Sequence, residues 1–98
     1  MAYTIAVKPG AEEDIEHIYN WYEDQKEGLG AEFLAELVFY YKKLEQQPAV
    51  FGKINKTYRQ AVLRRFPYII VFEVSKSEVI IYAVFHKSRN PKNRIRRK

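Results

Sequence analysis

The sequence contains no cysteine and only two histidines among its 98 residues. Without cysteine it can form neither a disulfide nor a thiolate metal site, which fits a reducing compartment. It also lacks an apolar run of about 18 or more residues, the length that a membrane-spanning helix needs. Its N-terminus alternates polar and apolar residues and shows no secretory signal. We therefore expect a soluble, unprocessed, cytoplasmic protein without a membrane partner.

Acidic residues are almost missing from the second half of the chain. Residues 1–48 hold four Lys and ten Asp or Glu (4 − 10 = −6), whereas residues 49–98 hold thirteen Lys or Arg and only Glu73 and Glu78 (13 − 2 = +11). Seven of the thirteen cations fall between Lys87 and Lys98. The basic half is expected to meet a polyanion or an acidic peptide. For the tip, Arg94 to Lys98, a solvated tail is the equally plain alternative.

Several familiar sites for phosphates, nucleophiles and metals are absent from the sequence. It has no Gly-rich phosphate loop, no Walker pattern and no nucleophile elbow. Its carboxylates are spread along predicted helix faces, so their spacing suggests no set of metal ligands. We expect neither a metal nor a cofactor.

Hydrophobic periodicity predicts one α+β domain over residues 1–98. Residues 3–7 alternate as a short strand that stops at Pro9 and Gly10. Apolar residues then recur at helical spacing from Ala11 to about Gln25. After a break at Gly28-Leu29-Gly30, the same spacing returns from about Ala31 to Gln47. Two helices joined by so short a turn predict an antiparallel hairpin. Residues 57–63, 68–74 and 78–85 then read as a three-stranded antiparallel meander, followed by a basic tail from about residue 92 to 98. The helices must cover one sheet, because nothing else can bury their apolar faces.

Aromatic residues are plentiful on the two predicted helices. We interpret most of them as core and hairpin packing, since aromatic side chains at helical spacing usually face the sheet. The aromatic residues of this predicted stripe are Tyr19, Tyr22, Phe33, Phe39, Tyr40 and Tyr41. Trp21 lies off the stripe and is expected to cover a helix edge.

Basic residues and one histidine mark two corners of the meander. Arg64 and Arg65 precede its first bend, while His86 and Arg89 follow its last strand. A neutral imidazole, favoured by the surrounding cations, could accept a proton, and paired guanidinium groups could clamp a phosphate. With Lys87 or Arg89 as the acid, these groups could cleave RNA without a metal. The plainer alternative is a surface histidine and arginines that bridge to acidic helix residues.

Several short segments between Tyr3 and Pro91 form a recognisable set when taken together with the order of elements. These are Asp14-Ile15-Glu16-His17-Ile18-Tyr19 with Tyr22, Gly28-Leu29-Gly30, Phe33-Leu34, Arg64-Arg65-Phe66-Pro67-Tyr68, Ala83-Val84-Phe85-His86 and Arg89-Asn90-Pro91. The set resembles the RelE/ParE superfamily of bacterial toxins. This resemblance implies a toxin of a type II toxin-antitoxin system, held inactive in a hetero-oligomer with a cognate antitoxin.

The resemblance divides between two branches. RelE-like members are ribosome-dependent mRNA endonucleases, and their basic residues match Arg64 or Arg65 at the bend and Arg89 or Lys87 beyond the last strand. RelE-like sites also use a C-terminal tyrosine that stacks on the substrate base, whereas here no aromatic residue follows Phe85. ParE-like members poison DNA gyrase and offer no catalytic residue to carry over. The Phe-Pro-Tyr bend and the intact helix hairpin are closer to the ParE branch.

Three functions are therefore open. The first is a ParE-like toxin that acts on DNA gyrase, and the second is a metal-free mRNA endonuclease that acts on the ribosome with His86, Arg65 and Arg64 as catalytic residues. The third is an inactive interaction module. For the first two, the expected target- or nucleic-acid-binding residues are Arg89, Lys87, Arg59 and Tyr68.

Overall fold

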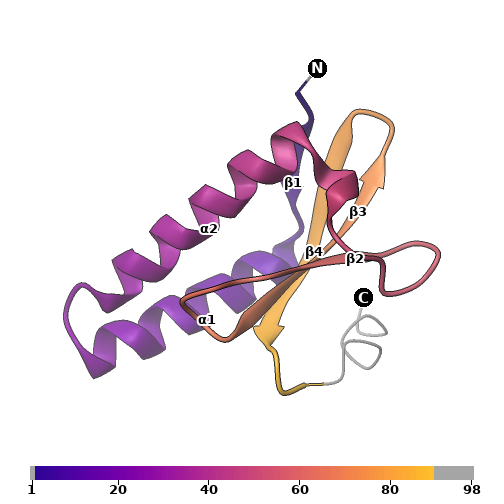
Figure 1. The fold of residues 1–98 in the computed structure, drawn as a ribbon. Helices are drawn as coiled ribbons and strands as arrows, with labels where there is room; N and C mark the ends of the chain where they lie inside the picture. Colours follow the sequence, from indigo (N-terminus) through magenta and orange to yellow (C-terminus); the bar gives the residue numbers. More distant parts are fainter. Residues whose placement is uncertain (1, 90–98) are drawn as a thin grey trace.

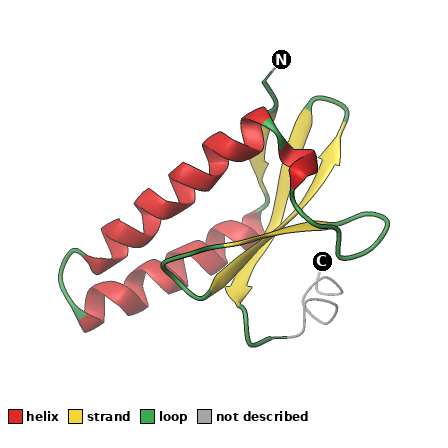
Figure 2. Cartoon of the chain, viewed as in Figure 1, coloured by secondary structure: helices red, strands yellow, loops and turns green. Residues whose placement is uncertain are grey.

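A computed structural model describes residues 2–89 of the chain and shows an α+β fold of two helices and one sheet (Figures 1 and 2). The elements are β1 (Thr4–Val7), α1 (Pro9–Gln25), α2 (Leu29–Gln46), the 3-10 turn η1 (Pro48–Val50), β2 (Arg59–Val62), β3 (Tyr68–Ser75) and β4 (Glu78–His86). Their order and type confirm the predicted fold. Asn90, Pro91 and the basic tail from about 92 to 98 lie outside the described residues.

The four strands form one mixed sheet in the order β1-β4-β3-β2. β2, β3 and β4 are antiparallel neighbours, which confirms the predicted meander. β1 runs parallel to β4, with Thr4 opposite Glu78 and Val7 opposite Ile81. A tight turn cannot join two parallel strands, so they need a long connection. Here the chain between β1 and β4 includes both helices.

The predicted boundaries differ from the observed ones by one or two residues in most elements, and three elements show the reasons. α1 begins at Pro9 and not at Ala11, since proline is well suited to the first helical position, where its missing N–H is not needed. α2 begins at Leu29, directly after Gly28 with its left-handed φ of 89°, and ends at Gln46, because Gln47 leaves the helical conformation with a φ of −145°. β2 is limited to Arg59–Val62, since the Asn55 side chain accepts the N–H groups of Thr57 and Tyr58 in a turn.

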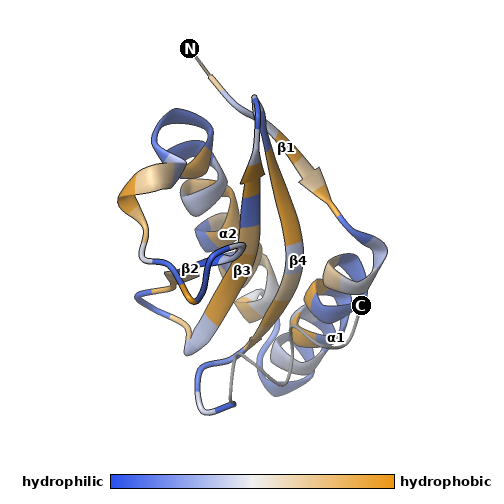
Figure 3. Cartoon of the chain, turned by 90° about the vertical axis from the view of Figure 1, so that its right-hand side faces the viewer, coloured by the Kyte–Doolittle hydropathy of each residue, from blue (hydrophilic) through white to orange (hydrophobic). Residues whose placement is uncertain are grey.

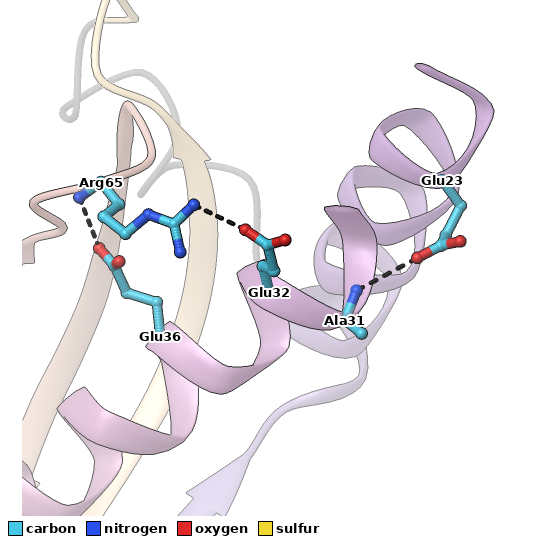
Figure 4. Close-up of polar contacts among 5 residues, drawn as sticks. All are labelled: Glu23, Ala31, Glu32, Glu36 and Arg65. Carbon is cyan, nitrogen blue, oxygen red and sulfur yellow. Dashed lines mark hydrogen bonds and ion pairs between the residues drawn. The ribbon is translucent and has the colours of Figure 1, made fainter. Parts of the chain in front are cut away.

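Glu23 supplies the cap that the start of α2 lacks. Gly28 has no side chain to bind the exposed N–H groups of the first turn. The Glu23 carboxylate, on α1, accepts the N–H of Gly28 at 3.1 Å and that of Ala31 at 3.2 Å (Figure 4). A negative group also suits the positive end of the helix dipole. One side chain therefore stabilises the turn that makes the two helices a hairpin.

The main core lies between the helices and the sheet. α2 buries residues at spacings of four, three and four, namely Phe33, Leu37, Tyr40 and Leu44. Phe33 is fully buried, and its ring lies 5.5 to 6.0 Å from those of Tyr22, Phe66 and Tyr68. The prediction was wrong for Phe39, which is 53% exposed because it falls on the opposite face of α2. Trp21 is also 55% exposed and packs edge-on against Tyr22.

The central strands β3 and β4 are largely hydrophobic (Figure 3), and their buried residues belong to two separate clusters. On the face away from the main core, Ile69, Val71, Ala83 and Phe85 form a second buried cluster against which Ile54 and Tyr58 pack. On the same pair of strands, the Tyr82 hydroxyl donates to the Glu73 carboxylate at 3.0 Å. Partial burial, this hydrogen bond and the Glu73 charge raise the pKa of Tyr82 to about 12. Within residues 2–89, neither helix is long and apolar enough to cross a membrane.

Gly30 sets how closely α2 approaches α1. A Cβ at this position would lie 2.7 Å from the Tyr19 carbonyl oxygen and 2.8 Å from the Tyr19 ring. We expect Gly30→Ala to lower the free energy of unfolding by about 1–2 kcal/mol, because overpacking outweighs the gain in helix propensity. Urea denaturation measures this, with Gly52→Ala as control, since nothing lies within 4 Å of a Cβ there. Equal stability of the two variants would contradict the close approach.

Candidate functional site

The end of the β2–β3 bend and the end of β4 meet at one edge of the sheet (Figure 1). The Lys87 N–H donates to the Pro67 carbonyl at 2.9 Å, which ties the segment after β4 to the bend. Tyr68 lies directly opposite His86 in the strand register. The exposed side chains at this edge, here called the basic rim, are Arg64, Arg65, His86, Lys87 and Arg89. The predicted meeting of the two corners is thus present in the backbone.

His86 is held by a short turn and by an aromatic neighbour. Its ring lies edge-on to Tyr68, with 5.4 Å between the ring centroids. Its Nδ1 accepts the Ser88 N–H at 3.1 Å and lies 2.9 Å from the Ser88 hydroxyl. A backbone N–H can only donate, so the neutral imidazole in this arrangement carries its proton on Nε2. In this state Nε2 can donate a hydrogen bond, and the proton acceptance suggested by the sequence would require Nδ1 to be released from Ser88.

A small cavity of about 170 Å³ brings His86 together with α1. Besides His86, its lining includes Asp14 and His17 from α1 and Arg89 from beyond β4. Both histidines of the chain therefore face one cavity, although they are far apart in the sequence. His17 was not predicted as a site residue. The only sequence feature that could have indicated it is its position on the same helix as Asp14, three residues further on.

Asp14 anchors the wall of this cavity. Its side chain is only 9% exposed, and its Oδ2 accepts the Val84 N–H of β4 at 3.0 Å. β1 pairs with β4 only as far as Ile81, so it does not reach Val84. The carboxylate of Asp14 thus binds β4 beyond the end of the parallel pair. This contact fixes α1, and with it His17, against the strand that carries His86.

The bend that carries the two arginines of the rim is bound to α2. Arg65 forms an ion pair with Glu32 at 2.7 Å, and the Glu36 carboxylate accepts the Arg65 backbone N–H at 2.9 Å (Figure 4). Glu36 also accepts the backbone N–H of Arg64 at 2.8 Å. Because Arg65 and Glu32 are both largely exposed, the pair contributes little stability and can open. Within residues 2–89, no hydrogen bond or ion pair joins either arginine to His86. The side-chain constellation expected for RNA cleavage is therefore not assembled in this conformation.

Arg59 and Tyr68, which the sequence predicted as binding residues, both have structural contacts. The Arg59 guanidinium donates to the carbonyls of Ala49 and Phe51 at 3.2 and 2.6 Å, which holds the η1 turn against β2. Tyr68 is half-buried, with its ring 6.2 Å from that of Tyr22. By contrast, Lys87 and Arg89 are exposed side chains with no such role among the described residues. No group of three or more His, Asp or Glu side chains in residues 2–89 has the arrangement of a metal site.

Comparisons with known proteins agree over nearly the whole chain. A family model described as the ParE toxin of the type II toxin-antitoxin system parDE matches residues 5–91. Toxin ParE2 of Mycobacterium tuberculosis (strain CDC 1551 / Oshkosh) is 28% identical over 95 residues, covering 93% of this chain and 88% of that protein.

Three solved structures share the fold. The chromosomal ParDE toxin-antitoxin system of P. aeruginosa gives a TM-score of 0.76 at 20% identity, covering 87% of this chain and 96% of that chain. The toxin-antitoxin complex RelBE2 of Mycobacterium tuberculosis gives a TM-score of 0.65 at 22% identity, covering 88% of this chain and 99% of that chain. The archaeal RelE-RelB complex of Pyrococcus horikoshii gives a TM-score of 0.57 at 11% identity, covering 92% of this chain and 100% of that chain. The predicted RelE/ParE-like fold is confirmed.

Proposed function

Because this chain belongs to the ParE toxin family of type II toxin-antitoxin systems, we propose that it inhibits bacterial growth by acting on DNA gyrase and is neutralised by a cognate antitoxin. The observation that carries the proposal is the family match over residues 5–91, which includes both helices and all of the sheet except the first residue of β1. The geometry of the basic rim supports a binding surface more than a nuclease site, since the Arg65 side chain pairs with Glu32 whereas His86 is held by Ser88.

An apolar groove between α1 and α2 supports the antitoxin as a partner. It has a volume of about 560 Å³, and its lining includes Ile15 and Tyr19 from α1 and Leu34 and Val38 from α2. Val38 is 50% exposed, and contiguous exposed apolar surface on a small protein usually marks an interaction site. Glu12 and Glu16 also line this groove. The antitoxin segment that fills it should therefore present apolar residues with neutral or cationic neighbours.

Lys87 and Arg89 are the rim residues best placed to meet the target, since both are exposed and free of the pairing that engages Arg65. We expect Lys87→Glu combined with Arg89→Glu to weaken inhibition of gyrase supercoiling by at least tenfold, because charge reversal at a binding edge repels the original partner. The measurement is the concentration of purified protein that halves supercoiling of relaxed plasmid, together with the amount of plasmid cut and held by gyrase.

The matched control is Lys26→Glu combined with Lys76→Glu. Both pairs of substitutions lower the formal net charge from +5 to +1 (5 − 4 = 1), and Lys26 and Lys76 are exposed at turns away from the rim. The control should inhibit gyrase nearly as well as the parent. If gyrase does not respond to the parent protein at all, the assignment to gyrase fails.

A second candidate function is metal-free cleavage of mRNA on the ribosome, which one observation favours. His17, His86 and Arg89 line one cavity, so neutral His17 could accept the proton of the attacking hydroxyl while His86, protonated on both nitrogens once its Nδ1 is released from Ser88, donates one to the leaving oxygen. In a cell-free translation reaction, this candidate requires cut mRNA with the parent and intact mRNA with His86→Ala or Arg65→Ala. A protein that affects neither gyrase nor translation would instead be an inactive interaction module.

A further inference from the structure

A cleft on the other side of α2 from the groove just described has no role in the proposed function. It has a volume of about 680 Å³ and lies between the last turns of α2, η1 and the β2–β3 bend. The residues that define it are Phe39, Tyr40, Lys42, Lys43, Phe51 and Arg64. The amide side chains of Gln46 and Gln47 also line it. We call it the α2 cleft.

One wall of the α2 cleft is a stripe of four residues along the helix. Phe39, Lys42, Lys43 and Gln46 follow one another at spacings of three, one and three, which places them on the same face of α2. Phe39 is 53% exposed, so its ring is available to a ligand. The Lys43 ammonium lies 5.1 Å from the centre of this ring, where it interacts with the aromatic face. An exposed aromatic ring with one cation over a face is therefore built into the helix, and its other face is the one that a ligand can stack on.

Positive charge lines both walls of the cleft. Arg64 faces the two lysines of α2 from the β2–β3 bend, and none of the lining residues is acidic. Glu32 and Glu36 of the same helix are occupied with Arg65 and with the backbone of the bend. The pKa of the Tyr40 hydroxyl is raised, mainly by burial and next by Glu36, while Arg64 opposes this shift. Glu36 is thus the negative group near Tyr40, and its carboxylate is bound by the backbone N–H groups of Arg64 and Arg65.

We propose that the α2 cleft binds a short segment of single-stranded nucleic acid. A base stacks on Phe39, while phosphates lie against Lys42, Lys43 and Arg64. Bases within a duplex already stack on one another, so an exposed ring in a cleft can receive only an unpaired base. The amides of Gln46 and Gln47 can bond base edges, which an acidic peptide would not require. The formal charge of +5 favours the approach of such a polyanion. This binding does not depend on whether the target is gyrase or the ribosome.

The stacking contact is tested by fluorescence anisotropy with labelled ten-nucleotide oligo(dT) and oligo(U). We expect Phe39→Ala to weaken binding roughly 10- to 100-fold, the loss typical of one stacked base. Phe39→Tyr should bind like the parent, because it keeps the ring. Phe39→Leu should lose affinity as Phe39→Ala does, because it keeps apolar surface without an aromatic face. Binding of the oligonucleotides by Phe39→Leu equal to that of the parent would overturn the proposal, because the aromatic ring would then not be the contact.

The phosphate contacts are tested by the salt dependence of the same binding. For a single strand, removing one cation that neutralises a phosphate should reduce the slope of log K against log salt by about 0.7. We therefore expect Lys42→Glu with Lys43→Glu to reduce this slope by about 1.4 relative to the parent. Lys26→Glu with Lys76→Glu changes the net charge equally but lies outside the cleft. A parent that does not bind, or equal slopes for the two double variants, would overturn the proposal without affecting the gyrase test.

Discussion

Phe33→Ala is expected to cost about 3–5 kcal/mol of the free energy of unfolding, which is typical of a fully buried phenylalanine. The ring is 0% exposed and is surrounded by the aromatic side chains of Tyr22, Phe66 and Tyr68. Truncation would remove these ring contacts and leave a cavity between α2 and the sheet. Since small domains are stable by only about 5–15 kcal/mol, this variant should be partly unfolded at moderate urea concentrations.

Phe39→Ala is the matched control, because it makes the same change six residues along the same helix. Phe39 is 53% exposed, so we expect a loss of about 1 kcal/mol or less, from its contacts with Tyr40 and Lys43. Phe33→Leu should fall between the two, since leucine fills part of the space. Urea denaturation followed by circular dichroism gives all three values. If Phe33→Ala and Phe39→Ala lost equal stability, the packing described for the main core would be contradicted.

The same aromatic cluster supports the basic rim. The ring of Phe33 lies 5.7 Å from that of Tyr68, and the ring of Tyr68 lies in turn 5.4 Å from that of His86. The bend that carries Arg64 and Arg65 is fixed by Glu36 on α2. The position of the exposed cations therefore depends on the packing of α2 beneath them. A rigid binding edge follows directly from the core.

The sequence predicted the order of elements because its periodicity changes at the right places. Helical spacing begins after Pro9, and alternation returns after residue 57, so the helices and the meander were both recognisable. The parallel pairing of β1 with β4 could not be predicted, because it joins segments more than 70 residues apart without a local signal. Its aromatic character suggested that Phe39 is buried, but its position in the helix does not. It falls outside the buried series of Phe33, Leu37, Tyr40 and Leu44.

The candidate site was less accessible to sequence reasoning than the fold. The two corners of the meander could be predicted to meet, since antiparallel neighbours bring them to one edge. However, a sequence does not state whether an arginine faces a ligand or a glutamate on a neighbouring helix. Arg65 and Arg59 are engaged by Glu32 and by backbone carbonyls, while His17 joins His86 only through the packing of α1 on β4. These contacts depend on tertiary structure, which local patterns do not contain.

Asp14→Ala is expected to lower the free energy of unfolding by about 2–3 kcal/mol, because a strand N–H would lose a charged acceptor in a buried place. The neighbouring acids Glu12 and Glu13 of α1 are exposed. Asp14 differs, since it is 9% exposed and bonds the Val84 N–H at 3.0 Å. Beyond Ile81, β4 has no pairing with β1, and the Asp14 carboxylate supplies the acceptor that a neighbouring strand would otherwise provide.

Two variants separate this hydrogen bond from the general effect of removing an acid. Asp14→Asn keeps an oxygen that can accept the Val84 N–H, so it should lose about 1 kcal/mol or less. Glu13→Ala removes a neighbouring exposed carboxylate and should change stability by no more than about 0.5 kcal/mol. Amide hydrogen exchange at Val84 reports the contact directly and should speed up in Asp14→Ala alone. If that exchange rate stays at the value of the parent, α1 is held on β4 by packing, and Asp14 does not position His17 beside His86.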